Sequence, residues 1–244
     1  MKAIAIIPAR LESTRLPRKV LRQIAGKPML AHVYDAVRQA AGLAEVLVAT
    51  DSEEVAALAH QRGWSVRLTS SAHRSGTERV QEVAASMSAD VYLNVQGDEP
   101  LARPEHIAAL LEPFADAAVQ VATLKTPCSS ADIHDPNAVK VVTDSSGRAL
   151  YFSRAAIPHD RDAAGGVRYY KHLGFYAYRR AALDCFAALP ESSLERSERL
   201  EQLRFLENGI PIHVVETPFD TIGVDTEEDL KRVEGILARR AVEK

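Results

Sequence analysis

Hydrophobic and polar positions follow a repeating pattern along the first hundred residues. Short runs rich in apolar side chains, typical of buried strands, occupy residues 3–7, 46–49, 66–69 and 91–95. The segments between them carry helix start signals. Pro28 precedes apolar residues at helical spacing, and Asp51 and Ser75 are each followed three residues later by a glutamate. Strands that alternate with helices in this way predict a parallel, doubly wound α/β sheet.

The pattern changes in the middle of the chain. The runs 139–143 and 148–152 flank Asp-Ser-Ser-Gly and predict a hairpin, and 169–178 predicts a further aromatic-rich strand. The stretch of about 128–180 is therefore expected to be an antiparallel insertion in a single domain of residues 1–244. The remaining predicted elements are a helix over 194–207, a strand over 212–215 and a last helix capped by Thr226.

Composition and charge exclude several function classes. The net charge of −3, from 33 acidic and 30 basic residues, argues against a general nucleic-acid binder. Cys128 and Cys185 form no Cys-x-x-Cys pair, so a disulfide scaffold or a cysteine-based zinc site is not expected. The apolar run at 3–9 is too short for a signal peptide, and no run has the length of a membrane span. We expect a cytoplasmic, globular protein with no membrane partner.

The loop after the first predicted strand is strongly basic. Arg10, Arg15, Arg18 and Lys19 fall within ten residues. Ligands of doubly wound sheets bind beyond the carboxyl ends of the strands, and guanidinium and ammonium groups bind phosphate oxygens. A triphosphate site is one interpretation, and a solvated basic loop is the other. The glycine spacing of a Walker A loop is absent.

Two further loops carry candidate ligands. Residues 73–79 combine Gly76, which permits close approach, with hydroxyl side chains at a helix N-terminus, although a plain capping box explains the same pattern. Asp98 follows a glycine at the end of the fourth strand, where a carboxylate can hold Mg²⁺ or simply form a turn. Asp225 follows another short apolar stretch, where it can cap a helix instead. If Asp98 and Asp225 converge, they form a carboxylate pair suited to a divalent cation.

The remaining polar residues of interest suit a hydroxylated acid rather than covalent catalysis. His172 and Tyr176 lie four apart in a predicted strand, Arg154 ends the hairpin, and Glu201 and Gln202 are expected in mid-helix. Each of them, taken singly, is more often structural. No Gly-x-Ser-x-Gly or His-Glu-x-x-His motif is present, so catalysis by positioning and charge neutralisation is favoured over a protein nucleophile.

Taken together, the motifs resemble one enzyme family over essentially the whole chain. The segments that carry the resemblance are residues 7–10, 13–17, 19, 26–29, 48–51, 75–79, 94–100, 137–142, 151–154, 172–174, 200–204 and 223–226. They are similar to the 3-deoxy-manno-octulosonate cytidylyltransferases, also called CMP-Kdo synthetases. The resemblance implies a nucleotide-sugar-transferase fold with an inserted dimerisation region, a homodimer, and transfer of CMP from CTP to Kdo, which activates the sugar for lipopolysaccharide synthesis.

The resemblance also implies residue roles. The triphosphate would be bound by Arg10, Ser13, Arg15 and Lys19, the cytidine would lie near Ser75, Gly76 and Thr77, and the cofactor Mg²⁺ would be held by Asp98 and Asp225. The sugar pocket would be lined by Gln96, Arg154, His172, Tyr176, Glu201 and Gln202. In this hypothesis the metal lowers the pKa of the sugar 2-hydroxyl for in-line attack on the α-phosphorus, while Lys19 and Arg15 stabilise the developing charge.

Two departures from the family pattern affect what the resemblance implies. The family commonly has glycine and proline where this chain has Arg18 and Val20, which leaves the mobility of the loop open. It often has tryptophan where this chain has His159, so an 8-amino analogue of Kdo stays open as a substrate. Transfer to a sialic acid is a second alternative, and a catalytically silent nucleotide-binding regulator is a third.

Overall fold

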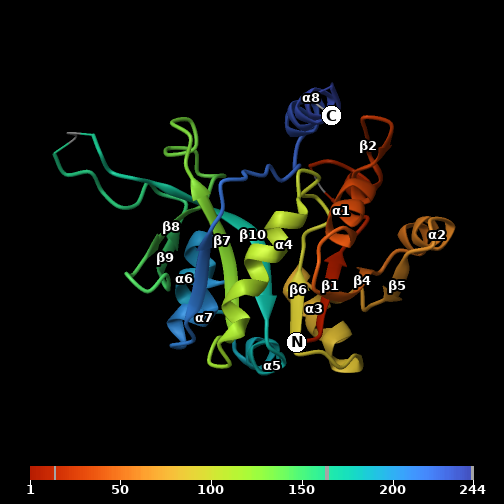
Figure 1. Cartoon of the computed structure of the whole chain (residues 1–244), viewed down its shortest axis with the longest axis horizontal. Coiled ribbons are helices and arrows are strands. Elements are labelled where there is room, and N and C mark those ends of the chain that lie inside the picture. The colour runs from red at the N-terminus through yellow and green to blue at the C-terminus, as the bar shows by residue number, and fades with distance from the viewer. Residues whose placement is uncertain (14, 163–164, 243–244) are drawn as a thin grey trace. The chain divides into compact units, whose positions relative to one another are not determined.

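The computed structural model describes residues 1–13, 15–162 and 165–242, so Thr14 of the basic loop lies outside it. The chain divides into two compact units (Figure 1). The first unit contains Met1–Ala108 and the chain from Thr221 onward, and the second contains Ala109–Asp220. The antiparallel stretch that the sequence predicts at about 128–180 falls within the second unit. None of the described helices is long and apolar enough to cross a membrane.

The first unit contains the predicted parallel sheet. Its strands lie in the order β6-β1-β4-β5, and all their pairings are parallel. Their bounds are β1 Ala3–Pro8, β4 Leu43–Thr50, β5 Ser65–Leu68 and β6 Val91–Asn94. Every residue of β1 and β6 is buried, which explains their continuous apolar character. The chain runs outward from β1 through β4 to β5 and then returns to β6 on the other side of β1.

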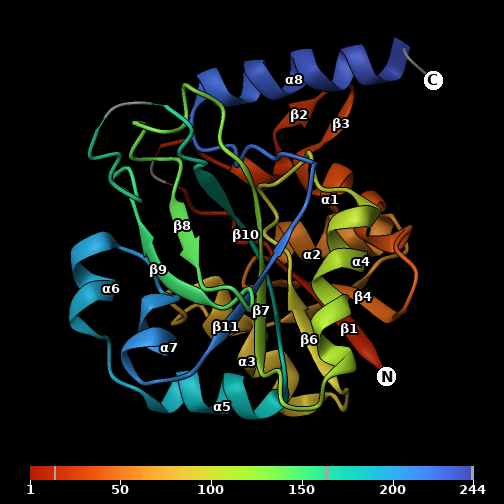
Figure 2. The same ribbon diagram turned by 60° about the vertical axis from the view of Figure 1, so that its left-hand side comes forward.

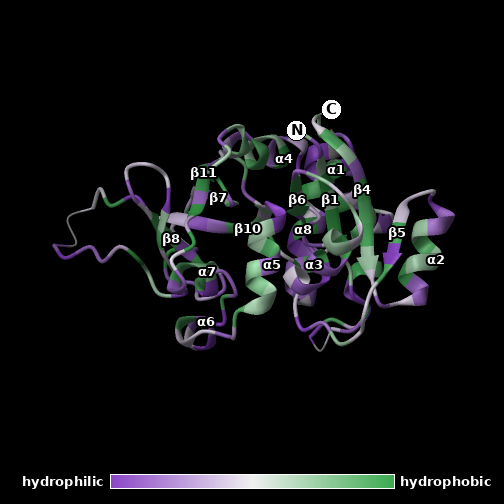
Figure 3. Ribbon diagram, turned by 90° about the horizontal axis from the view of Figure 1, so that it is seen from below, coloured by the Kyte–Doolittle hydropathy of each residue, from purple (hydrophilic) through white to green (hydrophobic). Residues whose placement is uncertain are grey.

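Helices cover both faces of this sheet. Figure 3 shows α1 and α3 on opposite sides of β1, as expected when the direction of the crossovers reverses. The helices of this part of the chain are α1 Met29–Arg38, α2 Glu53–Gln61, α3 Gly76–Ser86 and α4 Pro104–Leu111. The prediction that Asp51 caps α2 is wrong. Ser52 is the N-cap and its Oγ accepts a hydrogen bond from Val55 N, while the Asp51 carboxylate pairs with Arg79.

The second unit is mostly antiparallel. Strand β10 pairs antiparallel with both β7 and β8, and β8 pairs with β9 as the predicted hairpin. Strand β11 adds to β7 in the parallel sense. The bounds are β7 Val121–Pro127, β8 Lys140–Thr143, β9 Ala149–Ser153, β10 Tyr170–Tyr178 and β11 Ile212–Glu216. Strand β7, which pairs with β10 and β11, was not among the strands predicted from the sequence.

The prediction of one continuous helix over residues 194–207 is wrong. The chain forms two short helices, α6 Ser193–Glu198 and α7 Leu203–Glu207, after an earlier helix, α5 Arg180–Ala188. Arg199 ends α6 in the left-handed region with a φ of 55°. A residue in that conformation cannot continue a right-handed helix. Glu201 and Gln202 therefore lie in the turn between two helices rather than in mid-helix.

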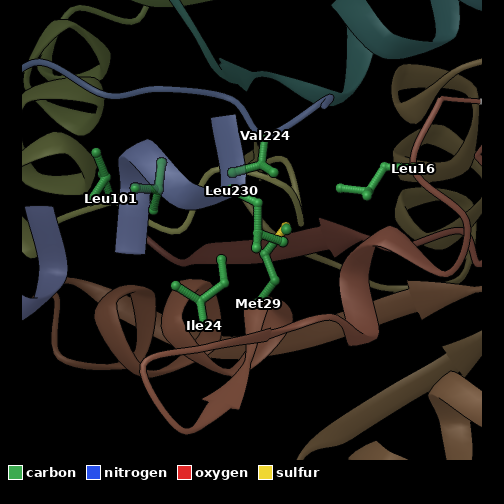
Figure 4. Packing of buried hydrophobic residues seen from close by; sticks show 7 residues of the cluster. Leu16, Ile24, Met29, Leu101, Val224 and Leu230 are labelled. Carbon is green, nitrogen blue, oxygen red and sulfur yellow. The ribbon is translucent and has the colours of Figure 1, made fainter. Parts of the chain in front are cut away.

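The C-terminal helix α8, Glu227–Val242, packs beside the small hairpin formed by β2 Gln23–Ile24 and β3 Lys27–Pro28 (Figure 2). Thr226 caps α8 as predicted, because its Oγ1 accepts from Asp229 N at 3.1 Å. Figure 4 shows the apolar side chains between these elements. This cluster, termed here the α8 cluster, comprises Leu16, Ile24, Met29, Leu101, Val224, Leu230 and Val233. It joins the basic loop and the segment before Asp225 to one buried core.

Candidate active site

A cavity of about 870 Å³ opens at the carboxyl ends of the strands of the first unit. Its lining comes from the loops after β1, β4, β5 and β6 and from Asp225 before α8. Because β1 lies between β4 and β6, the cavity sits where the direction of strand connection reverses, the usual ligand position in open α/β sheets. The volume is in the range of small-molecule sites.

The basic loop supplies one wall of the cavity. Arg10, Ser13, Arg15, Arg18 and Lys19 all line it. The loop is anchored by Leu16, which is buried in the α8 cluster and donates its backbone N–H to Ser13 Oγ at 3.4 Å. The basic residues therefore face a binding cavity and not only bulk solvent.

Arg18 adopts a backbone conformation that favours glycine. Its φ is 58°, in the left-handed region, and its guanidinium forms an ion pair with Glu54 of α2. This geometry gives a physical reason for the glycine common at this position in the family that the sequence resembles. In this chain an arginine takes the same conformation and ties the loop to α2.

Lys19 lies between the two aspartates singled out from the sequence. Its Nζ donates to Asp98 Oδ2 at 2.5 Å and to Asp225 Oδ1 at 2.8 Å. Arg15 Nη2 binds the other oxygen of Asp225, Oδ2, at 2.8 Å. The Lys19 side chain is only 13% exposed, whereas that of Arg15 is 61% exposed. The structure thus brings Asp98 and Asp225 together, and balances their two negative charges with two cations.

Backbone contacts explain why residues so far apart in sequence converge. Val224 N donates to Asp98 O at 2.9 Å, which holds the segment before α8 against the loop after β6. Thr221 Oγ1 donates to Glu99 Oε2 at 2.6 Å in the same region. Because Thr226 caps α8, the carboxylate of Asp225 remains available to the cavity. The alternative that Asp225 is the helix cap is therefore wrong.

The environment keeps these groups charged. Burial opposes the charged form of Lys19, but Asp98 and then Asp225 outweigh it and raise the pKa of the lysine above its ordinary value. For Asp225, burial acts to raise the pKa of the carboxyl, but Lys19 and Arg15 lower it overall. The lysine is a cation and Asp225 a carboxylate at neutral pH.

The loop after β5 forms another wall of the cavity. Ser75 and Gly76 line it, while Thr77 is buried and is not among the lining residues. Ser75 Oγ accepts from Glu78 N at 3.2 Å. Ser75 therefore caps α3, as the capping-box interpretation predicts, and also lines the cavity. The Glu78 carboxylate accepts from Arg74 N at 2.8 Å.

A buried arginine supports this wall and was not identified as a site residue from the sequence. Arg79 is 3% exposed; it donates to Asp51 Oδ2 at 2.9 Å and to the hydroxyl of Thr69. It therefore connects the ends of β4 and β5. The sequence signal for a buried arginine is its position four residues before Val83, which places a charged residue on the apolar face of α3.

The loop after β6 approaches β1 very closely. Gly97 N donates to Pro8 O at 3.3 Å, and a Cβ at Gly97 would lie 2.9 Å from that same oxygen. Gln96 and Asp98, on either side of Gly97, both line the cavity. The glycine is thus required by a close approach of two backbones, and that approach sets the position of Asp98 relative to the basic loop.

The other proposed sugar-binding residues lie in the second unit. The rings of His172 and Tyr176 are 5.4 Å apart, and Phe152 packs edge-on against His172 at 5.0 Å. Protein atoms surround the His172 ring closely, although part of the residue stays accessible, and this desolvation lowers the pKa of the imidazole to about 3. Burial likewise raises the pKa of Tyr176 well above its usual value. Both side chains are neutral at physiological pH.

Arg154 and Gln202 differ in how far their polar groups are satisfied. The Arg154 guanidinium donates to the carbonyl oxygens of Glu198 and Pro136, at 2.7 and 2.9 Å, and so ties the end of β9 to the α6–α7 turn. By contrast, Gln202 Nε2 and Tyr176 Oη are among the buried side-chain atoms of the described residues for which no hydrogen-bond partner is found. Buried groups of this kind are usually satisfied, so they are the ones that a polar ligand would complete.

The two aspartates supply part of the oxygen donor set that a magnesium ion needs. No group of three or more His, Cys, Asp or Glu side chains in the described residues is arranged to hold a metal ion. Mg²⁺ is, however, commonly bound by one or two carboxylates together with substrate phosphates and water. Asp98 and Asp225 both contact one ammonium group, so they already share a cation-binding position. The donor set fits Mg²⁺ if a phosphate ligand supplies the remaining oxygens.

Comparison with known proteins agrees with this arrangement. A cytidylyltransferase family model matches residues 4–216. A 3-deoxy-manno-octulosonate cytidylyltransferase of Koribacter versatilis is 66% identical over 240 residues, covering 98% of this chain and 92% of the relative. The enzyme of the same name from Acidobacterium capsulatum is 61% identical, with 98% of each chain covered. Among solved structures, CMP:2-keto-3-deoxy-manno-octonic acid synthetase in complex with CTP superposes with a TM-score of 0.94 at 45% identity, covering 98% of this chain and all of the other.

Proposed function

The chain belongs to the 3-deoxy-manno-octulosonate cytidylyltransferase family, and from this we propose that it transfers CMP from CTP to Kdo and releases diphosphate. One observation carries the proposal beyond the family assignment. The cavity at the switch point of the sheet brings the four cationic side chains of the basic loop together with two converging aspartates. This is a site for a triphosphate, because cations bind its oxygens while the carboxylates favour a bound cation.

The reaction forms a bond between the sugar 2-hydroxyl oxygen and the α-phosphorus, and the bond from the α-phosphorus to the bridging oxygen of the diphosphate breaks. The hydroxyl proton leaves to solvent and diphosphate is released. In this proposal Arg10, Ser13 and Arg15 bind the phosphates, and Lys19 stabilises the charge that accumulates during transfer. Asp98 and Asp225 would hold Mg²⁺, which supplies Lewis-acid chemistry and makes the sugar hydroxyl more acidic. The residues act by positioning and charge, without a covalent enzyme intermediate.

We further propose that Gln96 of the first unit is a sugar ligand, and we propose residues of the second unit as sugar ligands on separate grounds. The unsatisfied atoms Gln202 Nε2 and Tyr176 Oη support this proposal, since a hydroxylated acid offers matching hydrogen-bond partners. His172, neutral because its ring is desolvated, would contribute a hydrogen bond rather than a charge. Glu201 adjoins Gln202 in the same turn. Arg154 is supported as a sugar ligand only by the family resemblance, because its guanidinium already binds backbone carbonyls.

The homodimer and the cytoplasmic location are also proposals. Leu150 in β9, part of the predicted inserted region, is 62% exposed, and an exposed apolar side chain of this size supports a subunit contact there. Size-exclusion chromatography with light scattering would test the dimer. A cytoplasmic location follows from the proposed use of CTP, and cell fractionation would test it.

The reaction is tested by measuring diphosphate release with CTP and Mg²⁺ in parallel assays with Kdo, its 8-amino analogue and N-acetylneuraminate. We expect rapid release with Kdo that EDTA abolishes. Preferential release with the amino analogue would assign the alternative sugar. Absence of release with all three acids, despite tight CTP binding, would refute the proposed reaction and favour a regulatory role.

A further inference from the structure

Lys19 occupies the position between the proposed metal-binding aspartates. Its Nζ lies 2.5 Å from Asp98 Oδ2 and 2.8 Å from Asp225 Oδ1. One ammonium group therefore takes an oxygen of each carboxylate, and Arg15 takes the second oxygen of Asp225 at 2.8 Å. A cation cannot bind both carboxylates through these oxygens while Lys19 keeps this position.

We propose that Lys19 acts as an internal cation that keeps the metal position closed until the nucleotide binds. This inference rests on the proposed metal-binding role of Asp98 and Asp225. The triphosphate competes for Lys19 and Arg15, since both line the same cavity as the rest of the basic loop. When the side chains of Lys19 and Arg15 bind phosphate oxygens instead, the carboxylates of Asp98 and Asp225 become available to Mg²⁺. The enzyme thus acquires its metal together with CTP and binds it weakly beforehand.

Burial and charge both support this role. The Lys19 side chain is 13% exposed, so its contacts with the carboxylates are screened less than those of a surface pair. The site is electrically balanced without ligands, with Lys19 and Arg15 facing the two aspartates. A divalent cation added to this arrangement would meet two positive charges nearby. By thermodynamic linkage, a ligand that draws these cations away must increase the affinity of the site for metal.

The experiment measures metal binding without nucleotide or sugar. Nucleotide-free enzyme is titrated with Mn²⁺, a paramagnetic substitute for Mg²⁺, and free Mn²⁺ is followed by electron paramagnetic resonance. The test variant, Lys19→Met, removes the charge and keeps most of the side-chain length. Lys27→Met is the matched control, because it removes the same charge from a pair with Asp35 outside the cavity lining. Lys19→Arg keeps a cation in the site.

We expect Lys19→Met to bind Mn²⁺ about tenfold or more tightly than the wild type, because a unit charge a few ångströms from the ion is absent. Lys27→Met and Lys19→Arg should bind as weakly as the wild type. Adding Asp98→Asn to Lys19→Met should remove the gain. Circular dichroism melts show whether Lys19→Met is folded. If it is not, Lys19→Gln, which also removes the charge, replaces it with the same expected gain.

Two results would overturn the proposal. The first is that Lys19→Met binds Mn²⁺ no more tightly than the wild type does. Absence of Mn²⁺ binding to every one of these proteins counts as the same result. The second is a gain that survives Asp98→Asn, because the ion would then bind elsewhere. The Mn²⁺ titration can fail without the diphosphate-release assay failing, and the reverse also holds. Diphosphate release with CTP and Kdo by the wild type, without a gain in Lys19→Met, would refute this inference alone. A gain without release would refute the reaction alone.

Discussion

Substituting Gly97 by alanine should damage the active site by forcing apart two backbone segments next to Asp98. A Cβ at Gly97 would lie 2.9 Å from Pro8 O, whereas ordinary contact begins at 3.4 Å, so the two backbones must separate by about 0.5 Å. The added Cβ would also lie 3.5 Å from Leu30 Cδ1 and from Ala9 Cβ, which leaves little room to relax. Overpacking of this kind costs roughly 1–3 kcal/mol of stability.

The displacement should also reach the chemistry. Asp98 follows Gly97 directly, and its carboxylate binds Lys19 at 2.5 Å. A misplacement of about 1 Å can lower a rate about a hundredfold, so we expect kcat to fall on the order of tenfold or more in Gly97→Ala. Diphosphate release gives kcat and KM, and a thermal melt followed by circular dichroism gives the change in stability.

Two other glycines provide controls for the same chemical change. A Cβ at Gly223 would meet only the carboxylate of Glu99, at 3.2 Å, and a side-chain end has to shift there by only a few tenths of an ångström even though it accepts from Thr221. A Cβ at Gly235, inside α8, would meet nothing within 4 Å, and alanine there should stabilise the helix by up to about 1 kcal/mol. Wild-type kcat and stability in Gly97→Ala, or a larger loss in Gly223→Ala than in Gly97→Ala, would refute the reasoning.

Three further predictions concern different parts of the molecule. Asp98→Asn should lower kcat at least about a hundredfold while the fold stays intact by circular dichroism, because the charge of a proposed metal ligand is lost; full Mg²⁺-dependent activity would contradict it. The pKa of His172 is about 3 in the folded protein and near 6.5 when unfolded, so unfolding takes up a proton between these values and stability falls as pH drops from 6.5 toward 3. Urea unfolding should therefore show the wild type losing up to about 2 kcal/mol more than the non-titrating His172→Gln between pH 6.5 and 5, and equal losses would refute the shift. Leu230→Ala should cost about 2–4 kcal/mol, because it leaves a cavity in the α8 cluster, whereas Leu68→Ala at an exposed position should cost less than about 1 kcal/mol in the same melts.

Within the first unit, local sequence determined the elements of the sheet. A strand buried on both faces needs a continuous apolar run, and β1 and β6 have one, so their positions could be predicted without tertiary information. The capping signals at Ser75 and Thr226 likewise act within a few residues of sequence. The rule that ligands bind at the carboxyl ends of parallel strands then pointed to the basic loop and Asp98, both of which line the cavity.

Only the tertiary structure decided which of two adjacent residues caps α2, and where the predicted 194–207 helix breaks. Ser52 and Asp51 are both good caps in sequence, but Asp51 is occupied by the buried Arg79 of another helix. The break at Arg199 depends on a left-handed conformation that no local signal marks for arginine.

The arrangement of the site depended on long-range contacts. Asp98 and Asp225 are far apart along the chain, and they meet because Val224 N bonds to Asp98 O and because the α8 cluster packs Val224 together with Leu16. Residue types and loop positions identify the candidates in the sequence, since chemistry resides in side chains. Distances between those side chains arise from packing and hydrogen bonds between distant segments. For that reason the sequence indicated a cation site, and the structure showed Lys19 between its two carboxylates.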